Sequence, residues 1–218
     1  TGIDFDQDML ETARKNYPDC NFYYRDLLNW RDLNKFKNKF STVIISSTLH
    51  EIISEPHKMQ IWKIAYELLR DEGILIFRDG VKPTDGTKDI EVILKTPYSK
   101  EKVKKFIKEY RNRKINCVFI NDMRISIKNY DLHDLLCKYY FEGDLWERDM
   151  NESFGQETQN EYFDIISKNF YIIYSETYIA PYLKELWIKD FQIVNGNYPN
   201  SHILIVAKKS IKNLRQLK

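Results

Sequence analysis

Short apolar runs and amphipathic segments alternate along the first eighty residues of the chain. The β-branched run 41–47 and the apolar run 74–77 are typical of parallel strands buried on both faces. Residues 7–16 and 54–72 carry apolar side chains at helical spacing. Strands that alternate with helices predict a parallel sheet with crossover connections. We therefore expect an α/β fold.

The alternation breaks in residues 81–156. This region contains a basic helix ending near Arg113, a second helix over 131–141, and a stretch rich in acidic and aromatic residues. It is too long for a crossover connection and too apolar for disorder. We predict an inserted α-rich subdomain that acts as a lid or substrate subdomain over the carboxyl edge of the sheet. The alternative is an insertion that contributes no site residue.

The alternation returns in residues 157–210, with a helix, a strand, a further helix and a closing strand. We expect residues 1–80 and 157–210 to form one core. With 218 residues, 43% of them hydrophobic, the chain is long and apolar enough for such a core.

Charge and cysteine content narrow the protein class. The net charge of +2 provides no global field for nucleic acid or membranes, and no apolar run approaches ~20 residues. Three cysteines without ligand spacing indicate reduced thiols and a cytoplasmic protein. The histidines show no metal-ligand spacing, so we predict no metal. The chain starts with Thr1 in a strand-like segment, and we expect the true N-terminus to lie upstream.

Polar side chains follow several of the predicted strands. In parallel α/β sheets, ligands bind at the carboxyl ends of the strands. An acid at such a position can accept both hydroxyl protons of a ribose, which makes Asp4 a candidate nucleotide ligand. The alternative is a plain strand-to-helix turn. The residues at these strand ends are Asp4, Asp26, Ser46, Ser47, Arg78 and Asp79.

Four segments in this order resemble class I S-adenosylmethionine-dependent methyltransferases. They are GIDFDQDMLETAR at 2–14, Asp26, FSTVIISSTLHEI at 40–52 and LLRDEGILIFRD at 68–79. The resemblance implies a Rossmann-like doubly wound sheet that is mostly parallel, with an antiparallel last strand at 201–208. The family's Gly-rich loop has no counterpart here and would lie upstream of Thr1. Without that loop, cofactor binding by this chain would be impaired.

The resemblance also implies S-adenosylmethionine as the cofactor and assigns residues to it. Asp4 would hold the ribose hydroxyls, and Phe5 and Met9 would pack on the adenine. Asp26 would accept the adenine amino group with the backbone of Leu27. The methionine moiety and the transferred methyl group would be lined by Ser46 and Ser47.

On the substrate side, the resemblance places His50, Glu51, Arg78 and Asp79. His50 titrates near neutrality and follows a strand end, so it is the best candidate for a general base. Its alternative is a packed histidine at a helix start. Glu51 either orients His50 or begins the helix. Arg78 and Asp79 either face substrate or form an internal ion pair.

The function expected from these features is methyl transfer to a small molecule by in-line displacement. One alternative is an RNA or protein methyltransferase, for which the basic helix at 100–113 would track phosphates. A second alternative is a catalytically inactive methyltransferase-fold binding protein, suggested by the missing Gly-rich loop. A nicotinamide-dependent enzyme is a weaker option. The sequence carries no signal of oligomeric state.

Overall fold

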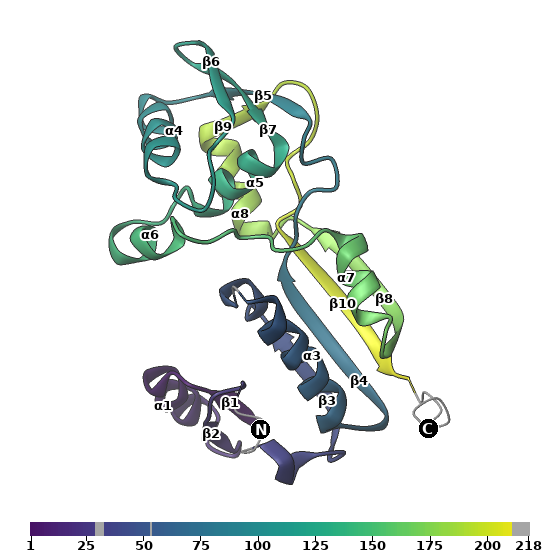
Figure 1. The fold of residues 1–218 in the computed structure, drawn as a ribbon. Coiled ribbons are helices and arrows are strands. Elements are labelled where there is room, and N and C mark those ends of the chain that lie inside the picture. The colour runs from purple at the N-terminus through teal and green to yellow at the C-terminus, as the bar shows by residue number, and fades with distance from the viewer. Residues whose placement is uncertain (29–32, 53, 211–218) are drawn as a thin grey trace.

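The computed structural model describes residues 1–28, 33–52 and 54–210 (Figure 1). Its strands are β1 Gly2–Asp4, β2 Phe22–Tyr24, β3 Phe40–Ser46, β4 Leu69–Gly80, β5 Asp89–Leu94, β6 Cys117–Asn121, β7 Arg124–Lys128, β8 Phe170–Tyr178, β9 Phe191–Ile193 and β10 His202–Lys209. Its helices are α1 Gln7–Asn16, α3 Glu55–Leu68, α4 Pro97–Glu109, α5 Asn129–Lys138, α6 Gly143–Asp149, α7 Gln159–Ile166 and α8 Pro181–Asp190, with short 3₁₀ turns η1 Asn34–Phe36 and η2 Leu49–Glu51. These elements form a lower and an upper group in Figure 1.

The lower group contains a two-stranded sheet, β1-β2, and a four-stranded sheet in the order β3-β4-β10-β8. The pairs β1–β2 and β3–β4 are parallel, whereas β10 is antiparallel to both β4 and β8. The mixed α/β class is therefore confirmed. The single doubly wound sheet is not reproduced, because no described strand bridges β1 and β3.

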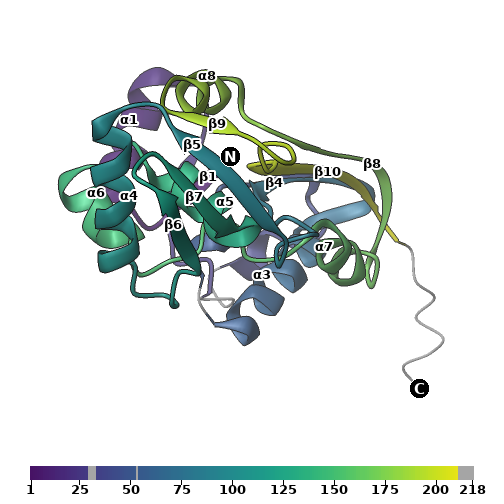
Figure 2. The same ribbon diagram turned by 90° about the horizontal axis from the view of Figure 1, so that it is seen from above.

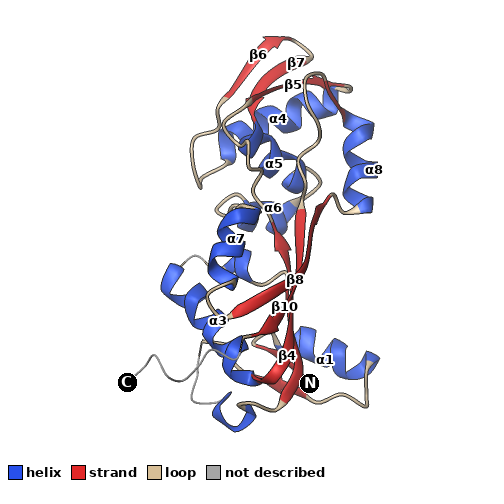
Figure 3. Cartoon of the chain, turned by 90° about the vertical axis from the view of Figure 1, so that its right-hand side faces the viewer, coloured by secondary structure: helices blue, strands red, loops and turns tan. Residues whose placement is uncertain are grey.

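The four-stranded sheet has one buried face and one open face. Ile45, Phe77 and Ile205 pack against α3 and α7 in a common core, and both helices lie on the same side of the sheet in Figure 3. On the opposite face, Ile44 is 66% exposed and Tyr174 is 48% exposed. Within the described residues, helices therefore cover this sheet on one side.

Helix α1 begins where the sequence predicts. The side chain of Asp6 caps it by accepting hydrogen bonds from the amides of Asp8 and Met9. Leu10 is buried, whereas Met9 is 62% exposed, although its position in the amphipathic pattern of 7–16 suggests an inward-facing side chain. The exposed Met9 side chain leaves an apolar surface beside the carboxyl end of β1.

Helix α3 is shorter than predicted, and β4 is correspondingly longer. The helix ends at Leu68, and Leu69 already pairs with Phe40 of β3. The backbone then turns sharply, with Glu72 at φ +63° and a register shift between β3 and β4. A Cβ at Gly73 would lie 2.8 Å from the carbonyl oxygen of Arg70, so glycine permits this bulge.

The upper group is built on an antiparallel sheet in the order β6-β7-β5-β9. The prediction of an α-rich region is corrected here, because 117–127 folds as the hairpin of β6 and β7. Figure 2 looks down on this group and shows α8 beside β9.

Helix α8 and strand β9 share the core of the upper group. Trp187 and Phe191 are buried with Val92 and Leu135, and the Trp187 indole donates to the carbonyl of Leu136 at 2.8 Å. The sequence had grouped these elements with the 157–210 part of the core. The role of 81–156 as a lid stays a prediction. Among the described residues, no helix is long and apolar enough to span a membrane.

Candidate functional site

The carboxyl ends of β3 and β4 meet beneath the upper group (Figure 1). Ser46 and Arg78 are register partners at this edge. The next residue, Ser47, has φ +51°, and its amide donates to the carbonyl of Arg78 at 2.8 Å. This left-handed conformation turns the chain sharply at the strand end. The turn directs residues 48–50 back toward β4.

The carboxylate of Asp79 is buried and organises this turn. Its Oδ2 accepts from the amides of Thr48 at 3.1 Å and Leu49 at 2.7 Å. Its Oδ1 accepts from the amide of Gly80 at 2.8 Å and lies 2.6 Å from His50 Nδ1. Because Asp79 Oδ1 accepts this hydrogen bond, the proton of neutral His50 lies on Nδ1, and Nε2 is the basic nitrogen. No described residue forms a hydrogen bond to Nε2.

Two expectations about this site change. Asp79 does not pair with Arg78, because consecutive strand residues point to opposite faces of the sheet. Asp79, rather than Glu51, orients His50. Burial disfavours the imidazolium of His50, but the Asp79 hydrogen bond and charge, with Glu51 and Glu152, outweigh it. The pKa of His50 is therefore raised above its usual 6.5.

Residues 153–156, called the covering segment below, lie over His50. The ring of Phe154 stacks on that of His50, with centroids 6.0 Å apart and planes 24° from parallel. The Gln156 amide donates to the carbonyl of His50 at 3.0 Å. These contacts leave the His50 side chain 21% exposed. The segment therefore restricts access of water to the imidazole.

Two glycines allow the covering segment to cross β4 closely. A Cβ at Gly80 would lie 2.2 Å from the carbonyl oxygen of Phe154, and one at Gly155 would lie 2.7 Å from Val81. Sequence reasoning missed Phe154 and Gln156. The glycine pair is the local signal that marks the crossing, but it does not reveal which segments cross.

Arg78 projects to the other face of β4. Its Nε donates to the hydroxyl of Tyr178 at 2.9 Å, and its Nη1 donates to Ser47 Oγ at 2.9 Å. In the described part of the chain, no carboxylate lies within ion-pair distance of this guanidinium. Tyr178 was also missed, because it belongs to β8, far away in sequence.

The two acids predicted to bind the cofactor lie at the ends of neighbouring parallel strands. Asp4 pairs with Tyr24 in register, and Asp26 follows β2. Asp4 Oδ1 accepts from the amide of Asp6 at 2.9 Å, and Asp26 Oδ1 accepts from the amide of Leu28 at 2.8 Å. Each carboxylate retains an oxygen without a hydrogen bond from described residues. Such oxygens suit the hydroxyl and amino donors of a nucleoside.

The remaining cofactor candidates fall into two places. Phe5 is 66% exposed beside Met9, which gives an apolar surface next to the acids; Leu27 is half-buried. Ser46 ends strand β3 of the separate four-stranded sheet, and Ser47 follows it. The structure thus places the predicted cofactor residues in two groups that no described strand joins. In the first group, the free carboxylate oxygens of Asp4 and Asp26 and the exposed apolar side chains of Phe5 and Met9 fit a nucleoside.

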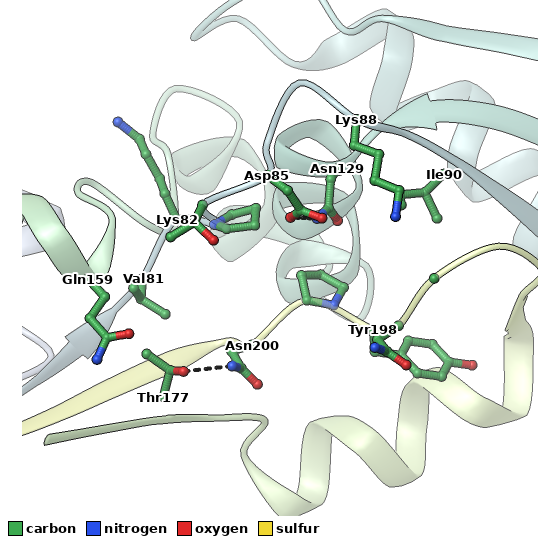
Figure 4. A pocket seen from close by; sticks show the side chains of 15 residues that line it. Val81, Lys82, Asp85, Lys88, Ile90, Asn129, Gln159, Thr177, Tyr198 and Asn200 are labelled. Atoms are coloured by element: carbon green, nitrogen blue, oxygen red, sulfur yellow. Dashed lines mark hydrogen bonds between the residues drawn. The ribbon is translucent and has the colours of Figure 1, made fainter.

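Two pockets lie near the junction of the two groups. Figure 4 shows one of about 300 Å³, in which Asn200 donates to Thr177 near Lys82 and Lys88. The other, of about 500 Å³, reaches His133 beneath the covering segment. Neither is lined by a residue predicted from the strand ends. No described group of histidine, cysteine and acidic residues has a geometry that could hold a metal ion.

The basic helix α4 is largely neutralised by acidic partners. Its ion pairs and those of the residues just after it include Lys102–Glu142, Lys104–Glu101, Lys105–Glu109, Arg111–Glu147 and Arg113–Asp134. A helix paired in this way presents little net positive charge to a phosphate backbone.

The fold of this chain is similar to that of S-adenosylmethionine-dependent methyltransferases. One such enzyme from Mesorhizobium loti superposes with a TM-score of 0.54 at 15% identity, over 95% of this chain and 79% of its own. Another, from Methanosarcina mazei, superposes with a TM-score of 0.51 at 13% identity, over 95% and 80%. No protein-family model and no curated protein matches the sequence.

Proposed function

We propose that this protein is an S-adenosylmethionine-dependent methyltransferase acting on a small molecule. One observation carries the proposal: a His50–Asp79 pair at the carboxyl edge of a sheet with a methyltransferase fold. Ligands bind at that edge in α/β sheets. A buried carboxylate that fixes one imidazole nitrogen prepares the other to take a proton.

The cofactor would be held on both sides of the gap between β1 and β3. Asp4 and Asp26 would bind the ribose and adenine, with Phe5 and Met9 against the base. Ser46 and Ser47 would line the methionine end and the transferred methyl group, where the cofactor meets the acceptor. When bound, S-adenosylmethionine supplies an electrophilic methyl group on a sulfonium.

His50 would remove the proton of the methyl acceptor at Nε2 while Asp79 holds Nδ1. Alignment of acceptor and methyl group in line contributes ~7–11 kcal/mol in well-oriented reactions. The covering segment supports this role because it limits water at the imidazole. The ion pairs of α4 favour a small acceptor over RNA, since few of its cations remain available for phosphates.

Methyl transfer from labelled S-adenosylmethionine to a panel of hydroxyl and amine acceptors tests this function. We expect turnover by the full-length protein, and a ~10²-fold or greater loss of kcat in His50→Gln. His57→Gln, which changes an exposed histidine of α3, is the matched control and should leave kcat unchanged. Equal kcat in His50→Gln and the wild type would exclude His50 as the base.

A further inference from the structure

Arg78 is a partly buried cation whose described partners are neutral. Tyr178 and Ser47 hold its guanidinium from two sides by accepting hydrogen bonds of 2.9 Å each. Asp79 points to the opposite face and is occupied by His50. Glu176 lies in line with Arg78 across the sheet but bonds to a tyrosine of its own strand. The positive charge at this strand end is therefore not matched by a described carboxylate.

Several N–H groups of the Arg78 guanidinium have no hydrogen-bond acceptor among the described residues. A guanidinium has five N–H groups. Tyr178 and Ser47 accept one each, so three remain. Because both hydroxyl oxygens act as acceptors here, their own protons remain free to donate, and no described residue accepts them. Arg78, Tyr178 and Ser47 thus converge as donors with no local acceptor.

We propose that Arg78, Ser47 and Tyr178 form a receptor for an anionic group, a carboxylate or a phosphate, on the methyl acceptor. Arginine in a fixed orientation favours planar, bidentate recognition of such groups. The role as an acceptor site rests on the proposed methyltransferase function. The anion binding itself does not.

The receptor and the base share one turn of the chain. Ser47 and His50 flank the residues that Asp79 fixes by their amides. Because Arg78 and His50 lie on opposite faces of β4, a methyl acceptor that reaches both would extend around the carboxyl end of this strand. The substrate class that follows is a small carboxylic acid or phosphate ester that also carries a hydroxyl or amine.

The test titrates the full-length protein with phenyl phosphate, benzoate and neutral benzamide at low ionic strength, observed by NMR. We expect saturable shifts at Arg78 Nε–H and nearby amides with one or both anions, and none with benzamide. The stronger of the two anions identifies the group. Arg78→Gln should raise the Kd ~10-fold or more, as expected for a lost charge-assisted hydrogen bond. Arg78→Lys should recover only part of the affinity, because it keeps the charge but loses the planar, bidentate donor geometry.

Arg70→Gln is the matched control, since it removes an exposed arginine from the other end of β4. It should bind the anions like the wild type. Equal losses of anion affinity in Arg70→Gln and Arg78→Gln would overturn the proposed receptor. Chemical-shift changes with benzamide as large as those with the anions would overturn it as well. A selective loss of S-adenosylhomocysteine affinity in Arg78→Gln would also overturn it, by assigning Arg78 to the cofactor. Anion binding without any methyl transfer would instead reject the proposed function and leave the receptor standing.

Discussion

The carboxylate of Asp79 forms four hydrogen bonds, which fix the side chain of His50 and the backbone around it. A fully buried carboxylate is costly to desolvate, and here amides and an imidazole compensate that cost. Because His50 has a raised pKa in the folded protein, it stabilises the fold below its unfolded pKa of 6.5. That contribution is lost as pH rises through the folded pKa.

The Asp79–His50 contact predicts a pH effect on catalysis. The basic form of His50 appears as pH rises through its raised pKa, so kcat/KM should increase with a midpoint above 6.5. Asp79→Asn removes the charge and leaves the burial, and this should lower the His50 pKa and move the midpoint to lower pH. Proton NMR titration of the His50 ring, beside the rate profile, measures both. An unchanged His50 titration in Asp79→Asn would contradict the contact.

A second histidine predicts sensitivity to acid. Burial lowers the pKa of His133 to about 4, although Asp134 partly opposes this effect. The unfolded chain therefore binds a proton between pH 6.5 and about 4 that the folded protein does not. The free energy of unfolding should fall by ~3 kcal/mol over that range from this residue alone. Urea unfolding at pH 7 and pH 5 should show the decline, and His133→Leu should reduce its slope. A pH-independent unfolding energy would contradict a neutral, buried His133.

At the scale of elements, the covering segment depends on helix α5. Asp134, 1% exposed on that helix, accepts from the Phe154 amide at 2.8 Å and from the Tyr110 hydroxyl at 2.7 Å. The guanidinium of Arg113 lies 2.7 Å from the same carboxylate. This buried network connects the upper group to His50 through Phe154.

Asp134→Asn should break this network and release the covering segment. Removing one partner of a buried ion pair costs ~3–5 kcal/mol. We expect a loss of stability of that order and faster hydrogen exchange at the Phe154 amide. Asp144→Asn, an exposed acid on α6, is the control and should change stability by less than ~0.5 kcal/mol. If Asp134→Asn and Asp144→Asn have the same free energy of unfolding, Asp134 does not anchor the covering segment.

Elements could be predicted from the sequence where local signals decide them. The cap of α1 by Asp6 is such a signal, and the bounds of that helix agree with the prediction. The predicted end of α3 was wrong, because the pairing of Leu69 with β3 overrides the helical pattern of the sequence. The contacts of Phe154 and Tyr178 with the site are non-local, so no pattern in their own segments reveals them.

At the scale of the whole molecule, no strand of the described residues pairs with the outer edge of β3, and the sheet face around Ile44 is exposed. About a fifth of the methyltransferase from Mesorhizobium loti lies outside the matched region, since 79% of its chain is covered. The positions of Asp4 and Asp26 at adjacent strand ends were predictable from the order of the strands. Their placement in a sheet separate from Ser46 was not, because sheet pairing depends on partners outside each segment.

The most direct test of the account is the binding of S-adenosylhomocysteine to the full-length protein, measured by calorimetry. We expect micromolar affinity in the wild type and none in Asp4→Ala, because Asp4 would hold the ribose hydroxyls. Asp19→Ala, an exposed acid in the turn after α1, should bind like the wild type. Absence of binding to the wild type, or equal binding by Asp4→Ala, would contradict the claim that the protein binds S-adenosylmethionine through Asp4.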